Sequence, residues 1–381
     1  MLTLLENGDV YAPERLGRTS VLLADSKIGK VGAVNARALR ELGVECEVVD
    51  VRGCVVAPGF IDPHQHLLGG SGEDGFSSQT PEFFISEIVT YGITTVVGAL
   101  GVDTTMKTMA GLLAKVKGLN EEGLNAYLWT GGYNVPPSSI MSSVREDIMY
   151  LDEVIGAGEI AISDLRAIDA SPRELARVVT DCYVGGMLAG KAKRAHFHVG
   201  DRDSMLQPLR DLLENYHVEA EWLYVTHVER CEALMREAIE LARKGAAVDI
   251  DVVGGDLLRW VEFYRENDGP PDQLTVSSDA AITSPRAVLE QLRECVQKGG
   301  IPLEEMLPLA TSNTARILGL ELKGRLEFGK FADLVVLERD SLEVVHVISR
   351  GKWMVRDGKE LASERFLEES TRRIELVGKK R

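Results

Sequence analysis

The chain has 381 residues, of which 45% are hydrophobic and 27% are charged, as in an ordinary globular protein. This length exceeds the size at which a single core stops growing, so we expect one large domain and a smaller one. The net charge of −16 argues against a nucleic-acid partner, because phosphate contacts need clustered Lys and Arg. No apolar run is long enough to span a membrane, so we expect no membrane partner.

The 5 cysteines lack Cys-x-x-Cys spacing, and the N-terminus lacks the basic and apolar regions of a signal peptide. We therefore expect free thiols in a reducing compartment, with the cytoplasm as the location.

Short β-like runs alternate with turn signals in residues 1–56, with one helical stretch at 35–42. From residue 55, apolar runs alternate with helical segments, which is the pattern of βα units around a parallel sheet. The predicted strands cover residues 55–66, 94–100, 126–133, 159–164, 195–200, 222–228, 246–253 and 274–279. The predicted helices between and after them cover residues 81–91, 104–122, 144–155, 171–183, 203–216, 231–244 and 284–298.

These units match a (β/α)8 TIM-like barrel in number and in length, about 250 residues. A doubly wound open sheet is the alternative, which we disfavour because no Gly-rich phosphate-binding loop follows an early strand. A further helix at 303–318 precedes β-like runs at 332–337 and 344–348, and a charged helix with a basic tail is expected from residue 364 onward. We predict a catalytic barrel at 57–321 and a small β-sandwich domain made from residues 1–56 and 322–381.

Histidines gather where the predicted barrel strands end. The chain has 7 histidines, and five of them lie at such ends: His64, His66, His196, His198 and His227. Active sites of these barrels lie at the carboxyl ends of the strands, and His is the commonest protein metal ligand. The strand ends therefore predict a metal site.

His64 and His66 are two residues apart, so in a strand both rings point to one face and can share a metal. His196 and His198 have the same spacing, and we favour His198 as the ligand because it lies nearer the strand end. Together with Glu159 and Asp279, these residues exceed the needs of one tetrahedral ion, which favours a two-metal centre.

The order of these residues, with Asp62-x-His64-x-His66, Thr226-His227 and Ser278-Asp279, resembles the amidohydrolase superfamily over the whole chain. The segments at 58–62 and 329–335 are also typical of it. Within the superfamily the chain resembles the bacterial isoaspartyl (β-aspartyl) dipeptidases, metallopeptidases that cleave dipeptides linked through the β-carboxyl group of Asp. The segments that carry this resemblance are 66–73, 130–136, 161–166, 197–201, 226–230 and 274–279.

The resemblance implies two zinc ions per subunit, bridged by Glu159 and a hydroxide. It assigns His64 and His66 to one zinc and His198 and His227 to the other. Asp279 would bind the first zinc and shuttle the proton. The remaining implied roles belong to the substrate pocket: Tyr133 polarises the scissile carbonyl, Glu73 receives the ammonium group, Arg166 and Arg230 hold carboxylates, and Gly72, Val102 and Thr283 lie beside the substrate.

Three positions depart from the pattern of the dipeptidases. Glu159 stands where they carry a carbamylated lysine, and no lysine lies between Lys117 and Lys191. Relatives similar to adenine deaminase carry Glu at this point, so a carboxylate bridge remains chemically reasonable, as does single-metal occupancy. Val102 and Thr283 replace a hydroxyl residue and a serine, and both positions bear on substrate choice.

Metal-dependent hydrolysis of β-aspartyl dipeptides is the leading expectation, with a small-molecule substrate and a homo-oligomeric assembly as in the relatives. The first alternative is a related amidohydrolase that acts on an N-acyl-amino acid, a cyclic amide or an amidine. The second is a non-catalytic scaffold, which the retained histidines and Asp279 disfavour.

Overall fold

The computed structural model describes residues 2–41 and 43–371 and contains two sheets. The barrel sheet has eight strands in the order β13-β12-β11-β10-β9-β8-β7-β6, and all of its neighbouring strands run parallel. The first strand is joined to the last by a parallel bridge between Gln65 and Ala280. This confirms the predicted (β/α)8 barrel.

Every predicted barrel strand has a counterpart in the structure. Their bounds are β6 (Phe60–Gln65), β7 (Ile93–Gly98), β8 (Asn125–Thr130), β9 (Val154–Ile162), β10 (Ala195–Val199), β11 (Leu223–Thr226), β12 (Ala247–Asp251) and β13 (Leu274–Ser277). Strand β9 begins five residues earlier than expected, within the segment that we assigned to the end of a helix. Its residues are all buried, so periodicity did not distinguish this strand from a buried helix end.

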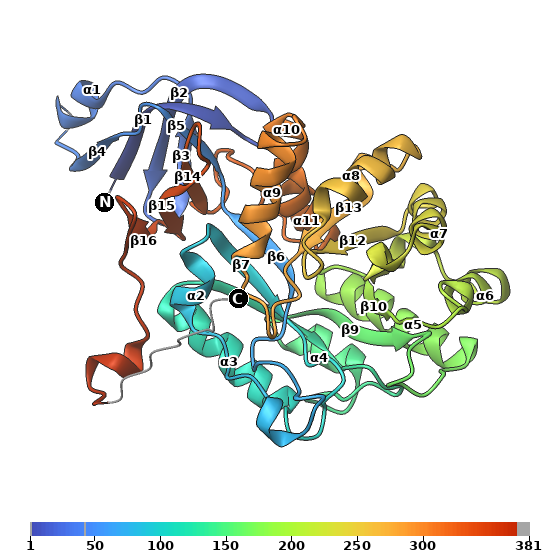
Figure 1. Cartoon of the computed structure of the whole chain (residues 1–381). Helices are drawn as coiled ribbons and strands as arrows, with labels where there is room; N and C mark the ends of the chain where they lie inside the picture. Colours follow the sequence, from blue (N-terminus) through green and yellow to red (C-terminus); the bar gives the residue numbers. More distant parts are fainter. Residues whose placement is uncertain (1, 42, 372–381) are drawn as a thin grey trace.

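Helices connect the barrel strands and cover their outer face (Figure 1). They are α2 (Ile85–Val89), α3 (Met109–Glu122), α4 (Val144–Tyr150), α5 (Pro172–Ala189), α6 (Gln207–Asn215), α7 (Glu232–Arg243), α8 (Leu257–Glu266) and α9 (Ala287–Gln297). We had not predicted α8. Residues 303–318, predicted as one helix, form α10 (Leu303–Met306), a 3-10 turn at Leu307–Ala310 and α11 (Ser312–Ile317). Pro308 lies at this break, since proline cannot continue an α-helix.

A second, largely antiparallel sheet joins the two ends of the chain, as predicted. Its order is β17-β16-β15-β14-β5-β1-β2-β3, and β4 pairs with β1. The N-terminal strands are β1 (Leu2–Tyr11), β2 (Arg15–Ala24), β3 (Lys27–Val31), β4 (Cys46–Asp50) and β5 (Cys54–Pro58). The C-terminal strands are β14 (Leu334–Glu338), β15 (Val344–Ser349), β16 (Lys352–Arg356) and β17 (Lys359–Glu360). Figure 1 shows both groups in one layer beside the barrel.

The predicted strand at residues 55–66 is wrong as a single element, because it divides between the two sheets. Strand β5 pairs with β14 in the sheet of the chain ends, while β6 pairs with β7 in the barrel. Gly59 lies between them, and a Cβ there would lie 2.3 Å from the hydroxyl oxygen of Thr94. Only glycine therefore fits at this crossing. The domain boundaries, which we placed at residues 56 and 322, stay a prediction.

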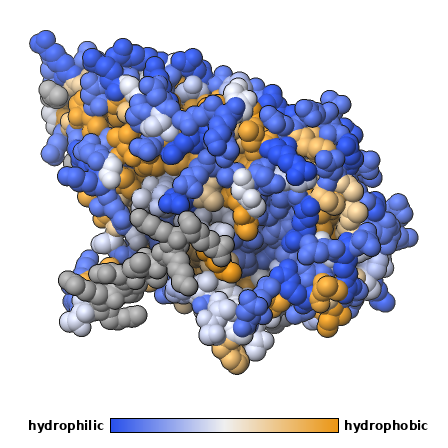
Figure 2. All heavy atoms as spheres, in the orientation of Figure 1, coloured by the Kyte–Doolittle hydropathy of each residue, from blue (hydrophilic) through white to orange (hydrophobic). Residues whose placement is uncertain are grey.

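The short helix α1 (Ala36–Glu41) agrees with the helical stretch expected at 35–42, although residue 42 lies outside the described residues. The tail expected from residue 364 shows a 3-10 turn at Arg365–Glu368 in place of an α-helix, and residues 372–381 lie outside the described residues. Figure 2 shows a face dominated by hydrophilic residues. No helix in residues 2–41 and 43–371 is long and apolar enough to cross a membrane.

Candidate active site

The predicted ligands come from five different strands and meet at one end of the barrel. His64 lies on β6 and His66 directly follows it, Glu159 lies on β9, His198 on β10, and His227 and Asp279 follow β11 and β13. His64 and Glu159 are fully buried, and His198 and His227 are at most 4% exposed. The parallel barrel thus brings together side chains that are up to 215 residues apart, from His64 to Asp279.

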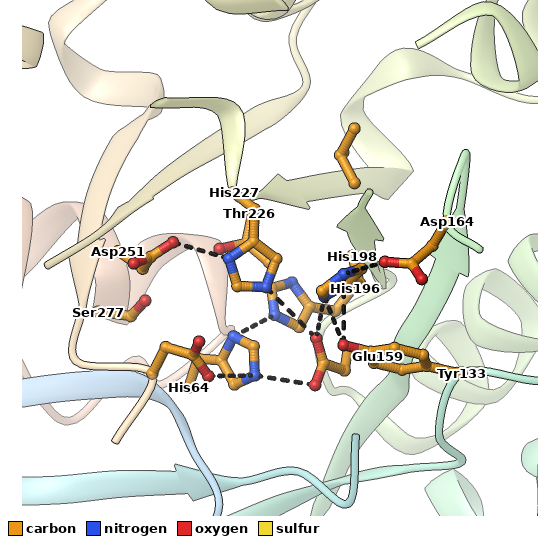
Figure 3. Close-up of polar contacts among 12 residues, drawn as sticks. His64, Tyr133, Glu159, Asp164, His196, His198, Thr226, His227, Asp251 and Ser277 are labelled. Carbon is orange, nitrogen blue, oxygen red and sulfur yellow. Dashed lines mark hydrogen bonds and ion pairs between the residues drawn. The ribbon is translucent and has the colours of Figure 1, made fainter. Parts of the chain in front are cut away.

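Glu159 lies between His64 on one side and His198 and His227 on the other (Figure 3), and His66 also lies on the side of His64. Its Oε1 is 3.3 Å from Nε2 of His64 and 3.6 Å from Nε2 of His66. Its Oε2 is 3.0 Å from Nδ1 of His198 and 3.6 Å from Nε2 of His227. One carboxylate oxygen therefore faces each pair.

Asp279 completes the group on the side of His66. Its Oδ1 lies 3.0 Å from Nε2 of His66 and 3.6 Å from Nε2 of His64. Asp279 and His227 both have a positive φ, 43° and 64°, which is rare for residues other than glycine. Such backbone conformations cost on the order of 1 kcal/mol and cluster at functional sites.

Asp62, in the motif that begins the barrel, connects the first strand to the last. Its buried carboxylate accepts hydrogen bonds from the backbone N–H of Ser278, at 3.1 Å, and from the side chain of Gln65, at 2.7 Å. Burial raises the pKa of Asp62 to about 6, although these hydrogen bonds oppose the change. This contact fixes the position of His64 relative to Asp279.

The charges in the site influence one another strongly. Burial alone would raise the pKa of Glu159, but the charge of His64, a hydrogen bond from His198 and the nearby imidazole of His227 lower it well below its usual range. Burial lowers the pKa of His64, but the negative charges of Glu159 and Asp279 outweigh burial and raise it to about 9. Without another cation, the site therefore favours carboxylates beside a protonated imidazole.

Several atoms of this group can hold a metal ion. Three sets of side chains place ligand atoms within 4.8 Å of one another: His64, His66 and Asp279; His64, Glu159 and His227; and His227, Asp251 and Asp279. Among the described residues, His64 Nε2, Glu159 Oε1 and Asp279 Oδ1 are buried without a hydrogen-bond partner. Buried polar atoms are rarely left unpaired, so these three atoms fit a cation between them.

A cavity of about 660 Å³ opens above this group, and most of the predicted substrate residues line it. The lining residues that we had predicted are His66, Gly72, Glu73, Val102, Tyr133, Arg166, His198, His227, Arg230 and Asp279. Gly72 has a φ of 76°, and a Cβ there would lie 2.6 Å from the side chain of Gln79, so the loop requires glycine. Thr283 is not among the lining residues, but it directly follows two that are, Ala281 and Ile282.

Tyr133 lies beside a predicted metal ligand, with its hydroxyl 3.0 Å from Nδ1 of His198. Burial, together with the charge of Glu159, raises its pKa well above the usual value. The phenol therefore stays protonated and can donate a hydrogen bond.

The charged residues of the pocket pair with one another. The guanidinium of Arg166 donates to Glu73 at 2.7 Å and to both carboxylate oxygens of Asp164, at 3.0 and 2.8 Å. Arg230 donates to Asp201 at 2.7 Å. Glu73 is 59% exposed and Asp201 is 75% exposed, so these two ion pairs are weak and can exchange for a ligand.

Two residues of the site had not been predicted as site residues. Asp164 follows β9 and lies 3.0 Å from Nε2 of His198, and Asp251 ends β12 and lies 2.7 Å from Nδ1 of His227. The signal was present, since Asp249-Ile250-Asp251 repeats the spacing of two residues at the end of a strand.

His196 is not among the residues grouped as metal ligands. It is stacked on Trp129, with ring centroids 5.0 Å apart, and its Nε2 lies 3.4 Å from Nδ1 of His64. Burial lowers its pKa well below the usual value, so the ring is neutral.

Residues 267–354 match the model of the amidohydrolase family. The β-aspartyl dipeptidase of Fervidobacterium islandicum AW-1 is 37% identical, with a TM-score of 0.90 over 94% of this chain and 98% of that chain. The chain belongs to the amidohydrolase superfamily. A structure of that dipeptidase with β-Asp-Leu is 36% identical, with a TM-score of 0.88 over 94% and 98% of the two chains.

The adenine deaminase of Halalkalibacterium halodurans is 25% identical over 93% of this chain. This chain covers 57% of that relative and 52% of a putative adenine deaminase of Bacillus cereus, so it spans little more than half the length of these proteins.

Proposed function

We propose that this protein hydrolyses β-aspartyl dipeptides in a reaction that depends on bound metal ions. The observation that carries the proposal is the arrangement around Glu159, whose two oxygens each face a pair of histidines below a pocket with charges of both signs. The similarity over the whole chain to a β-aspartyl dipeptidase supports the same substrate class.

We propose two zinc ions, one held by His64, His66 and Asp279 and the other by His198 and His227, with Glu159 shared between them. Zinc ligands lie about 2.0–2.2 Å from the ion, so two tetrahedral ligand atoms are separated by about 3.4 Å. The distances between nitrogen and carboxylate oxygen here are 3.0 to 3.6 Å, which supports this assignment. When bound, the ions would activate water at neutral pH and polarise the scissile carbonyl.

Asp279 is the proposed proton shuttle. Its carboxylate lies at the floor of the pocket and would accept the proton that the attacking water loses. Burial would raise its pKa, but the charge of His64 and the adjacent imidazole of His66 lower it, so the basic form is available. The same oxygen would then give the proton to the leaving amine.

Tyr133 is the proposed donor to the developing oxyanion. Its phenol remains protonated for the reason given above and lies within the pocket, next to His198. A preorganised donor in a buried site stabilises charge that appears only in the transition state.

The proposed substrate carries one ammonium group and carboxylates, and the pocket offers partners for each. Glu73 would bind the ammonium group, while Arg166 and Arg230 would bind carboxylates through their paired N–H donors. The ion pair between Glu73 and Arg166 would open when the substrate binds. The substrate ammonium group would then pair with Glu73, and a substrate carboxylate would pair with Arg166. Gly72, Val102 and Thr283 would contribute to the shape of the pocket.

A second candidate is the hydrolysis of another amide or of an amidine, as in adenine deamination. The curated relatives favour it, because the adenine deaminase of Halalkalibacterium halodurans matches 93% of this chain. Adenine carries neither an ammonium group nor a carboxylate, so this candidate leaves Glu73, Arg166 and Arg230 without a role.

A substrate panel with metal analysis tests these proposals. We expect turnover of β-Asp-Leu and none of α-Asp-Leu, N-acetyl-leucine or adenine. Turnover of one of the others without β-Asp-Leu would refute the substrate assignment. A purified protein that binds no zinc and gains no activity from added metal would support a scaffold.

The variant Glu73→Gln tests the proposed ammonium site separately. It removes the charge that faces the ammonium group, so we expect KM to rise about 10- to 100-fold, since a charge-assisted hydrogen bond contributes roughly 1.5–3 kcal/mol. The metal content should be unchanged because Glu73 touches none of the proposed ligands. A normal KM would remove Glu73 from substrate binding.

A further inference from the structure

Asp251 is a buried carboxylate at the end of β12, beside the proposed metal centre (Figure 3). Its Oδ2 lies 2.7 Å from Nδ1 of His227, and its Oδ1 accepts a hydrogen bond of 3.0 Å from the backbone N–H of Val253. The second contact anchors the carboxylate to its own strand end, so Asp251 is a fixed partner for the imidazole.

His227 presents its other nitrogen to the centre of the site. Nε2 of His227 lies 3.6 Å from Oε2 of Glu159, on the side where we place an ion. An imidazole can bind metal through Nε2 only if the proton of the neutral ring is on Nδ1. A carboxylate at Nδ1 favours that tautomer, fixes the rotation of the ring and makes Nε2 a stronger ligand.

Asp251 could in principle bind the metal directly, because it forms a potential ligand set with His227 and Asp279. Its hydrogen bonds favour the other role. Both of its oxygens already accept a hydrogen bond, from His227 and Val253. Glu159 Oε1 and Asp279 Oδ1, by contrast, are buried with no partner among the described residues. Of these three carboxylates, therefore, Glu159 and Asp279 keep an oxygen free for an ion and Asp251 does not.

We propose that Asp251 is a positioning residue that holds His227 with its proton on Nδ1 and its Nε2 facing Glu159. The inference rests on the proposed metal-dependent function. It adds a residue of the seventh barrel strand to a centre whose predicted ligands come from the first, fourth, fifth, sixth and eighth strands.

The experiment compares Asp251→Asn and Asp251→Glu with the wild-type protein. The matched control is Asp147→Asn, because Asp147 is also a fully buried carboxylate but accepts its hydrogen bonds from Thr130 and from the backbone of Ile140 and Met141. Circular dichroism checks folding. Competition with a chromophoric chelator gives the Zn²⁺ affinity, and the visible absorption of the Co²⁺-substituted protein reports on ligand geometry.

We expect Asp251→Asn to weaken one of the two metal equivalents about 10- to 100-fold and to change the Co²⁺ spectrum. Asp251→Glu, which keeps the charge, should recover part of the affinity, and Asp147→Asn should bind metal like the wild-type protein. If Asp251→Asn does not fold, the affinity and the spectrum of Asp251→Glu decide, because a longer arm must still shift the ring of His227.

Wild-type metal affinity and a wild-type Co²⁺ spectrum in Asp251→Asn would overturn the inference. Complete loss of one metal equivalent in Asp251→Asn, not restored in Asp251→Glu, would also overturn it, because Asp251 would then be a metal ligand. These readouts do not depend on the substrate. A protein that binds two metal ions but does not cleave β-Asp-Leu would refute the proposed activity and leave the test of Asp251 intact. A wild-type protein that takes up no metal would overturn both.

Discussion

The variant Glu159→Gln tests the proposed two-metal centre most directly. The change keeps the size of the fully buried side chain but removes the negative charge that faces His64 and His198. The two pairs of histidines would then have no carboxylate between them. The amide NH₂ of the glutamine would point at a histidine ring nitrogen, which cannot accept a hydrogen bond while it binds a metal ion.

The magnitude follows from the burial of the group. Removing one partner of a buried, hydrogen-bonded charge pair costs roughly 3–5 kcal/mol. One factor of ten corresponds to about 1.4 kcal/mol, so we expect metal affinity to fall by a factor of about 10² to 4 × 10³. Both equivalents should weaken, because Oε1 serves one pair of histidines and Oε2 serves the other.

Metal content after dialysis, chelator competition and turnover of β-Asp-Leu measure the effect. The control is Glu153→Gln, which removes a carboxylate paired with Lys117 at the surface, outside the lining of the active-site cavity. Two metal ions bound with wild-type affinity in Glu159→Gln would refute the bridging role. Glu159→Lys extends the test, since metal and activity restored by bicarbonate would show that the centre accepts a carbamate bridge.

Three further predictions address the shuttle, the protons of the site and the thiols. Asp279→Asn should keep much of the bound metal and lower kcat by about 10²- to 10⁴-fold, measured by steady-state kinetics and metal analysis. Because the pKa of His64 in the metal-free chain is raised to about 9, metal must displace its proton at neutral pH. Metal affinity should therefore rise with pH toward about 9, and calorimetry in buffers of different ionisation enthalpy should record the released protons. The exposed Cys231 should react with a thiol reagent in the folded protein, whereas Cys182, whose pKa burial raises to about 12, should react only after unfolding.

Each of these predictions has a result that contradicts it. Near-normal kcat in the variant would remove Asp279 from the mechanism. Metal uptake that is independent of pH between about 6 and 9, with no protons released, would contradict the raised pKa of His64. Rapid labelling of Cys182 in the native state would contradict its burial. Mass spectrometry of the peptides after digestion shows which cysteine carries the label.

The amino-acid sequence predicted the barrel because apolar runs alternate with helical segments, a local pattern that indicated eight strands and seven of the helices that connect them. It also predicted the candidate metal ligands His64, His66, His198 and His227, because all four fall at strand ends, which meet at one face in any parallel barrel. Both inferences depend on local sequence alone. The resemblance to the β-aspartyl dipeptidases also rests on sequence segments, at residues 66–73, 130–136, 161–166, 197–201, 226–230 and 274–279.

Only the tertiary structure decided which strand joins which sheet. The apolar run from Val55 to Ile61 supports a strand in either sheet, and the crossing at Gly59 depends on the close approach of Thr94. The break at Pro308 and the helix α8, by contrast, had local signals that we did not use. Proline cannot continue an α-helix, and the buried residues of α8 recur at the spacing of an amphipathic helix, namely Leu257, Trp260, Val261 and Tyr264.

The tertiary structure also decided how the polar residues pair. His196 and His198 are two residues apart, as His64 and His66 are. The ring of His196 nevertheless stacks on Trp129, whereas the ring of His198 faces Glu159. Asp251 meets His227 across two neighbouring strands, a contact set by their register. A sequence specifies which side chains reach the mouth of the barrel, while strand register and burial determine which atoms remain free to hold a metal ion.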